Sequence, residues 1–288
     1  MKISRVETEH CLVGEGPVWD VAEQALYFVD IVHRKVHRYD PSGGGTRSWE
    51  VPSVIGSMAL REQGGAIVAL KDGLHALDLD SGAVTPLALP DQPARVQFND
   101  GKVDRRGRFV VGSGDSDLKD TRHVGSLYSF AGGALTVLDT GIAIANGPCW
   151  SPDNRTLYFS DSLTYSIYAY DYDIDSGAVA NRRLFADTRE LGGIPDGATV
   201  DTDGLMWMAI CEGAKLVAFR PDGKVERIVD MPVKLPASVM FGGPDLDLLY
   251  VTTIDPALLG RPAEEGAGDL FVIEGLGARG IPEPRYAG

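Results

Sequence analysis

The chain has 288 residues, of which 44% are apolar and 24% charged, and its formal net charge is −14. Such an acidic chain repels nucleic acid and anionic membranes, so neither is an expected partner. Three widely spaced cysteines, Cys11, Cys149 and Cys211, predict buried free thiols rather than a disulfide framework. The N-terminus MKISRVETEH contains no apolar leader segment, and no stretch reaches about 18 apolar residues. We therefore expect a cytoplasmic, unanchored protein.

Six similar units follow one another along the chain, each a polar turn followed by a β-branched and aromatic strand. In order, these units begin at Trp19, Arg61, Asp104, Ser151, Asp201 and Gly243. One residue marks each strand, namely Tyr27, Ile67, Phe109, Tyr158, Trp207 and Tyr250, and successive markers are 40, 42, 49, 49 and 43 residues apart. A repeat of about 40 to 50 residues that contains several strands indicates a β-propeller.

Further alternating runs between the markers end in Asp-Gly or Ser-Gly, which is a hairpin signal. The sequence thus predicts an all-β, six-bladed β-propeller with about four antiparallel strands per blade, in which residues 1–288 form a single domain. The run DLFVIEGLG from Asp269 is expected to be a late strand of the sixth blade, and a strand near Ile3 to Thr8 is expected to complete that blade and close the ring. The alternative architecture is a pair of β-sandwiches.

In four of the six units a polar residue stands five positions before the turn. These residues are Glu15, Asn99, Asn146 and Asp196, whereas the second unit has Gly56 or Ser57 and the sixth has Ala237 or Ser238. The innermost strand of each propeller blade lines the central channel, so we expect the four residues to converge at one end of it. Two carboxylates and two amides would form a hard-oxygen site for Ca²⁺, Mg²⁺ or Mn²⁺ that could also accept Zn²⁺. Ordinary turn chemistry is the structural alternative for the same pattern.

The motifs that contain these residues resemble those of a known family. They are GEGPVWD, FNDGKVDRRGRF, NGPCWSPDNRTLYFSDS and IPDGATVDTDGLMW. Over nearly the whole chain the sequence is similar to the senescence-marker-protein, gluconolactonase and regucalcin family of six-bladed propellers. This resemblance implies one divalent metal ion in the channel and hydrolysis of a sugar lactone. It also implies that Glu15, Asn146 and Asp196 are metal ligands and that Asp196 is the general base.

The resemblance further implies three residues that contact the substrate. Asn99 matches a residue near both metal and substrate, and Asp117 falls near an acid that contacts sugar hydroxyls. Gln97 occupies a position where many family members have arginine. A neutral amide there replaces a charged guanidinium group. We therefore expect the preferred lactone to differ from the usual aldonolactone, while lactone hydrolysis is retained. Arg95 could substitute for that arginine only if the strand bulged.

Other functional classes remain open at this stage. A metal-dependent esterase or phosphotriesterase would use the same site, and a non-catalytic calcium-binding protein would bind the ion without turnover. An interaction scaffold would not need acids converging in the channel. The chain contains no Gly-x-Ser-x-Gly elbow, which argues against a serine esterase. The pattern identifies neither the physiological metal nor the oligomeric state.

Overall fold

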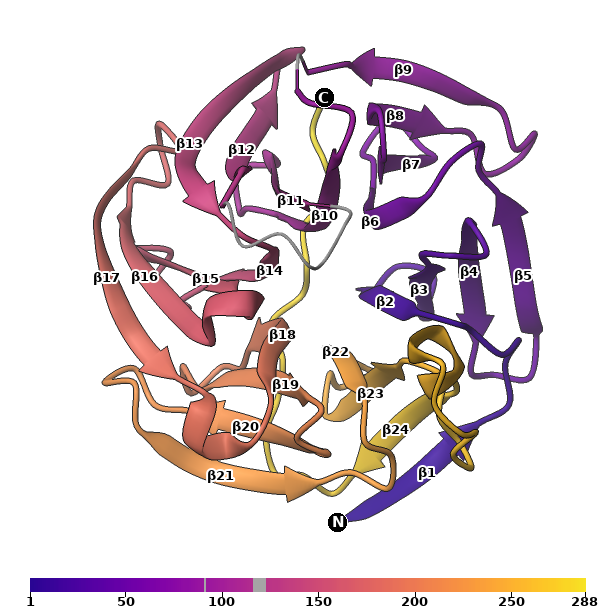
Figure 1. Ribbon diagram of the computed structural model, residues 1–288. Helices are drawn as coiled ribbons and strands as arrows, with labels where there is room; N and C mark the ends of the chain where they lie inside the picture. The colour runs from indigo at the N-terminus through magenta and orange to yellow at the C-terminus, as the bar shows by residue number, and fades with distance from the viewer. Residues whose placement is uncertain (91, 116–122) are drawn as a thin grey trace.

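The structure is a computed structural model that describes residues 1–90, 92–115 and 123–288. Within these ranges the strands form six antiparallel four-stranded sheets, arranged as blades around a central axis (Figure 1). The predicted all-β, six-bladed propeller is confirmed, and the alternative pair of sandwiches is wrong. The six marker residues all lie in the second strand of a blade, because each unit is a hairpin that leads away from the channel.

The first blade contains β2 (Gly14–Asp20), β3 (Ala25–Asp30), β4 (Lys35–Asp40) and β5 (Gly45–Glu50). The second contains β6 (Ile55–Leu60), β7 (Ala66–Leu70), β8 (Gly73–Leu77) and β9 (Val84–Ala88). The third contains β10 (Val96–Val103), β11 (Phe109–Asp115), β12 (Gly125–Ala131) and β13 (Ala134–Ile142).

The fourth blade contains β14 (Ala145–Trp150), β15 (Thr156–Asp161), β16 (Ser166–Tyr172) and β17 (Val179–Asp187). The fifth contains β18 (Ile194–Val200), β19 (Met206–Cys211), β20 (Lys215–Phe219) and β21 (Val225–Asp230). The sixth contains β22 (Pro236–Gly242), β23 (Leu248–Thr253), β24 (Leu270–Glu274) and β1 (Lys2–Val6). Short 3₁₀ turns are η1 (Ser162–Thr164), η2 (Arg189–Leu191) and η3 (Pro256–Leu259).

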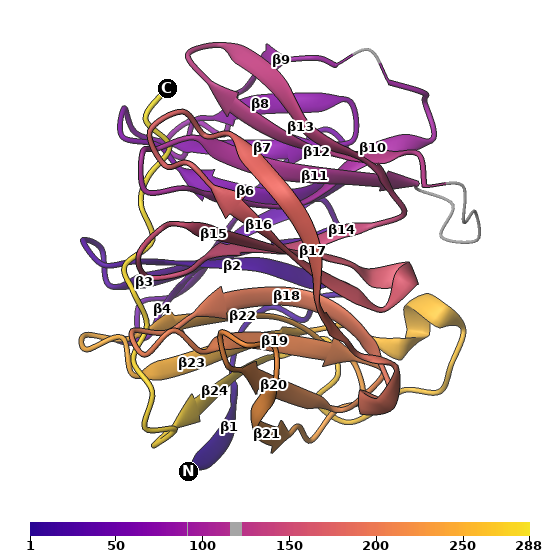
Figure 2. The same cartoon turned by 90° about the vertical axis from the view of Figure 1, so that its left-hand side faces the viewer.

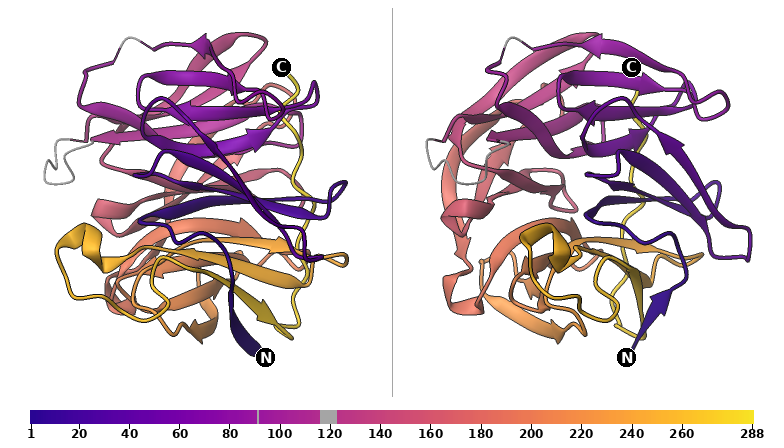
Figure 3. Two further views of the ribbon diagram at one scale, coloured as in Figure 1. Left: turned by 90° about the vertical axis from the view of Figure 1, so that its right-hand side faces the viewer. Right: turned by 45° about the vertical axis from the view of Figure 1, so that its right-hand side comes forward.

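The two ends of the chain close the ring in the sixth blade. The N-terminal strand β1 pairs antiparallel with β24, and Arg5 lies opposite Phe271. Figure 3 shows the indigo N-terminal strand alongside the gold strands of this blade. Backbone hydrogen bonds between the first and last strands therefore hold the ring shut, as the sequence predicted for the segment near Ile3 to Thr8.

The hydrophobic core consists of layers between adjacent blades. Trp19 of the first blade stacks on Tyr250 of the sixth, with ring centroids 5.6 Å apart. Trp207 meets Phe241 edge-on across the fifth and sixth blades, at 6.3 Å. The three cysteines are buried and free, as expected. Among the described residues, no helix has the length and apolar character needed to cross a membrane.

The two ends of the channel differ, because the last residues of the chain run across only one of them. Residues 275–288 cross the face at which the inner strands end, and they pass behind the centre of the ring in Figure 1 and along the left-hand edge in Figure 2. Bridges from Gly280 to Asp201 and from Tyr286 to Arg61 attach this tail, and Tyr286 stacks on Phe130 at 5.6 Å. The opposite face, where the inner strands begin, carries η3 at the right of Figure 2.

Candidate functional site

The four polar residues predicted to converge all lie near the beginning of an inner strand, on the face opposite the C-terminal tail. Glu15 is in β2, Asn99 in β10, Asn146 in β14 and Asp196 in β18. Glu15, Asn146 and Asp196 are 5%, 6% and 5% exposed, and Asn99 is half-buried. The second and sixth blades contribute small residues instead, so the polar groups of the other four blades define the mouth of the channel.

A β-bulge interrupts each of these inner strands next to its polar residue. The register shifts lie between Glu15 and Val18, between Phe98 and Gly101, between Asn146 and Cys149, and between Pro195 and Ala198. A bulge places two residues opposite one and redirects the side chains around it. Gly16 and Gly147 sit in two of the bulges with φ of +52° and +57°, a backbone conformation that favours glycine. All four strands bulge near the same place, so their polar residues keep the same spacing from the turn.

The two amides contact each other. Asn99 Nδ2 donates to Asn146 Oδ1 at 2.9 Å and also to the backbone oxygen of Ala145 at 2.8 Å. Asn146 Nδ2 in turn donates to Ser162 Oγ of η1 at 2.8 Å. Both side chains are thereby held in place, and the second lone pair of Asn146 Oδ1 remains available to a ligand.

The two carboxylates are both buried and interact electrostatically. Burial, followed by the negative charges of Asp196 and Asp100, raises the pKa of Glu15 well above its usual value. Burial and the charge of Asp100 raise the pKa of Asp196 likewise, whereas its hydrogen bond with Glu15 opposes that rise. The pKa values of both carboxylates are therefore raised in the folded protein, because buried acids near other negative charges ionise less readily without a cation.

Asp100 is a third buried acid that the sequence reasoning did not select. Its Oδ2 accepts the Gly147 amide and its Oδ1 accepts the Gly101 amide, both at 2.8 Å. Burial raises the pKa of Asp100, and the charge of Lys102 followed by these two amides opposes the shift. In a regular strand the side chains of Asn99 and Asp100 would point to opposite faces. The bulge turns both toward the channel region, and sequence alternation alone does not predict this.

The donor set fits a hard divalent cation. Glu15, Asn146 and Asp196 offer carboxylate and amide oxygens, which are the ligands that Ca²⁺, Mg²⁺ and Mn²⁺ prefer. No group of three or more His, Cys, Asp and Glu side chains in the described ranges forms a metal-binding cluster. The candidate set instead combines two carboxylates with the amide oxygen of Asn146.

The predicted substrate contacts are placed only in part. Gln97 lies in β10 opposite Gly114 and is half-buried, two residues before Asn99. Asp117 lies outside the described residues. Arg95 Nε is 3.6 Å from Asp115 Oδ2, so its charge is paired at the end of β11. The bulge of β10 begins after Phe98, and it therefore does not change the relation between positions 95 and 97.

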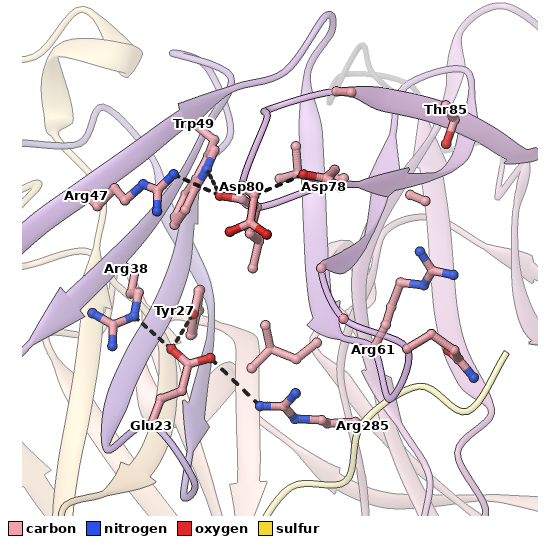
Figure 4. Close-up of a pocket in the computed structure, with 18 residues that line it drawn as sticks. Glu23, Tyr27, Arg38, Arg47, Trp49, Arg61, Asp78, Asp80, Thr85 and Arg285 are labelled. Carbon is pink, nitrogen blue, oxygen red and sulfur yellow. Dashed lines mark hydrogen bonds and ion pairs between the residues drawn. The ribbon is translucent and has the colours of Figure 1, made fainter.

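A cavity of about 610 Å³ lies away from the channel, between the first and second blades (Figure 4). Its arginines are largely engaged by neighbouring groups. Arg38 Nε donates to Glu23 at 2.9 Å, and Arg285 lies 3.9 Å from the same carboxylate. Arg47 Nη2 donates to the Leu79 oxygen at 2.9 Å and stacks over Trp49. None of the predicted site residues lines this cavity, so the channel mouth is the better candidate for chemistry.

The sequence is similar to known proteins over most of its length. A profile of the SMP-30/Gluconolactonase/LRE-like region matches residues 13–255. A regucalcin from Xenopus laevis is 36% identical over 296 residues, which covers 100% of this chain and 99% of that protein.

Two solved structures have the same fold along almost their whole length. A luciferin-regenerating enzyme superposes with a TM-score of 0.92 at 28% identity and covers 99% of both chains. A calcium-binding protein, regucalcin, from Agrobacterium tumefaciens superposes with a TM-score of 0.90 at 26% identity, covering 98% of this chain and 96% of that one. The chain therefore belongs to the SMP-30/Gluconolactonase/LRE-like family.

Proposed function

We propose that this protein is a divalent-metal-dependent lactonase that hydrolyses a sugar lactone, aldono- or related, to the hydroxy acid. Family membership supports a lactonase or a calcium-binding role. The observation that carries the proposal is the buried Glu15–Asp196 pair, whose raised pKa values mark a site that is short of positive charge. A buried pair of acids with raised pKa values at the mouth of a channel is characteristic of a functional site.

The residues that would hold one divalent ion (Ca²⁺, Zn²⁺, Mn²⁺ or Mg²⁺) are Glu15, Asn146 and Asp196. When bound, such an ion supplies Lewis acidity toward the lactone carbonyl. Asp196 is assigned as general base: it accepts a proton from the attacking water as the new C–O bond forms. The same proton then passes to the ring oxygen as the ring C–O bond breaks, which yields the free hydroxyl and the acid. The bulge at residues 196–197 fixes this carboxylate in the mouth.

Substrate recognition is assigned to the third blade. Asn99 is fixed by its two hydrogen bonds and stands next to Asn146, where it can contact a substrate oxygen. Gln97 lies on the same strand and offers a neutral amide, and Asp117 is the third proposed contact. The partner is a small, neutral or weakly charged sugar derivative in the cytoplasm. The net charge of −14 opposes nucleic acid and anionic membranes as partners.

Two other functions use the same residues. A metal-dependent esterase or phosphotriesterase would need the same ion and the same base, and it differs only in the ester it accepts. A non-catalytic calcium-binding protein is the second candidate, because a related structure is described as a calcium-binding protein. It would bind the ion tightly and turn over no ester.

The deciding experiment measures proton release from a panel of aldono- and uronolactones by metal-stripped protein, with each divalent ion added back. Asp196→Asn is the test variant, and Asp203→Asn, an exposed acid in the turn of the same blade, is the matched control. Metal-dependent turnover that falls by about 10²–10⁴-fold in Asp196→Asn and persists in Asp203→Asn supports the proposal. Turnover of aryl esters or phosphotriesters alone supports the esterase. Tight metal binding without any turnover supports the calcium-binding role.

A further inference from the structure

Lys102 is a buried lysine in the channel, and it has no part in the proposed chemistry. Its side chain is 9% exposed, and it extends from β10 in the third blade. Its Nζ donates to the backbone oxygen of Ala198 at 2.7 Å. Ala198 belongs to β18 in the fifth blade, two residues after Asp196. The lysine therefore spans past the fourth blade, between strands that lie on different sides of β14 in Figure 1.

This contact solves a problem that every inner strand shares. An inner strand has a neighbouring strand on one side only, so backbone groups on its channel side need other partners. Side chains of other blades supply them: Ser57 Oγ donates to the Asn99 oxygen at 2.7 Å, and Asp100 accepts the Gly147 amide at 2.8 Å. Lys102 serves the strand that carries Asp196 in the same way. It is the member of this set that brings a full positive charge.

The ammonium group also lies among buried acids. Its charge favours ionisation of Asp100, the residue that holds the bulge next to Asn146. Glu283 of the C-terminal tail, with a side chain that is 8% exposed, places Oε1 3.9 Å from Nζ. Arg105 Nη1 holds the other oxygen of Glu283 at 3.4 Å. Lys102 thus connects the third blade to the fifth blade and to the tail, and its charge acts on Asp100, which holds the bulge of the fourth blade.

We propose that Lys102 is a positioning residue: it holds the Asp196-bearing strand against the channel and keeps Asp100 in the place where it fixes the bulge beside Asn146. The inference rests on the proposed metal site formed by Glu15, Asn146 and Asp196. Lys102 acts on two of these three residues through the backbone, and it contacts neither substrate nor ion.

The direction in which cation affinity changes distinguishes a positioning role from a direct effect of the lysine charge. Removing a positive charge from a channel that binds a cation would, by Coulomb's law alone, strengthen cation binding or leave it unchanged. Loss of positioning would weaken it, because partners outside the ligand shell typically contribute about 10–100-fold to metal affinity. Weaker binding after loss of the lysine charge, together with faster backbone exchange at the ligand-bearing strands, therefore indicates displaced ligands.

The experiment uses Lys102→Met, which keeps the length of the stem and removes the charge and the donor. Lys224→Met, a lysine with a side chain that is 71% exposed, is the matched control. Ca²⁺ and Mn²⁺ affinities are measured by calorimetric titration of the folded, metal-stripped proteins. Hydrogen exchange of peptides that cover residues 145–150 and 194–200 is measured without metal. We expect metal affinity at least about tenfold weaker and faster exchange in both peptides for Lys102→Met, and parental values for Lys224→Met.

Equal or tighter metal binding by folded Lys102→Met, or unchanged exchange in both peptides, would overturn the inference. If Lys102→Met does not fold, Lys102→Gln is measured in the same way: it removes the charge, and its shorter stem draws the donor away from the Ala198 oxygen, so weaker metal binding and faster exchange are expected there too. Failure of the parent protein to hydrolyse any lactone would contradict the proposed function alone. The affinity and exchange comparisons would still test the role of Lys102.

Discussion

Replacing Asp196 with asparagine should stabilise the metal-free protein while abolishing its response to metal. In the absence of a cation, burial and neighbouring negative charges raise the pKa values of Glu15 and Asp196. Two unit charges about 4 Å apart at an effective dielectric constant of about 20 repel by about 4 kcal/mol. Protonation already relieves much of this, so we expect a gain of about 1–3 kcal/mol in the free energy of unfolding. For a chain of this size that corresponds to a Tm higher by about 2–5 °C.

The pH dependence of the free energy of unfolding shows in which direction the Glu15–Asp196 pair acts. Because the folded protein raises the pKa values of Glu15 and Asp196, it holds protons that the unfolded chain releases at lower pH. Their contribution to stability is therefore fully present below the unfolded value of about 4 and is lost as the pH rises toward the folded values. The metal-free parent protein should be less stable at pH 7.5 than at pH 5 on account of this pair. Asp196→Asn should flatten that slope.

Scanning calorimetry at both pH values, with and without Ca²⁺ or Mn²⁺, measures both quantities. Bound ion should raise the Tm of the parent protein, and more so at pH 7.5, whereas Asp196→Asn should show no such rise. Asp203→Asn controls for the loss of one acidic charge. A metal-free Tm of Asp196→Asn at or below that of the parent at pH 7.5 would refute the reasoning about the pair.

Three further changes test other parts of the structure. Gly56→Ala would place a Cβ 2.5 Å from the Asn99 backbone oxygen and 2.6 Å from the Asn99 Cα. Urea unfolding should therefore show a free energy of unfolding lower by about 1–3 kcal/mol. An unchanged midpoint would contradict the packing of β6 on β10. Gln97→Arg adds a planar cation at the proposed substrate-binding strand, so the KM for lactones that carry a free carboxylate should fall relative to that for neutral aldonolactones. An unchanged ratio would remove Gln97 from the substrate site. Deleting residues 1–7 removes β1 and leaves β24 as an unpaired edge. Light scattering should then detect aggregation, and calorimetry a broadened unfolding transition. A soluble monomer with the parental Tm would show that ring closure by β1 is dispensable.

The repeat architecture could be predicted from the sequence because its signals are local. Each unit carries its own turn chemistry, and in the fifth blade Asp201 Oδ1 accepts the amides of Asp203 and Leu205 while Gly204 takes a φ of +84°. A turn of this kind followed by an apolar strand is readable without knowledge of its neighbours. The period of the units then predicts the propeller, and the shared spacing predicts which end of the channel gathers Glu15 and Asp196.

Only the closed ring determines what those residues contact. The bulges that turn Asn99 and Asp100 both toward the channel region break the alternation on which sequence reasoning depends. Lys102 and Ala198 are 96 positions apart and meet only because the blades close around one axis. The C-terminal tail brings Glu283 to the same lysine from the far end of the chain. These contacts satisfy backbone groups and charges that no single repeat can satisfy by itself, so they depend on tertiary structure and leave no periodic signal in the sequence.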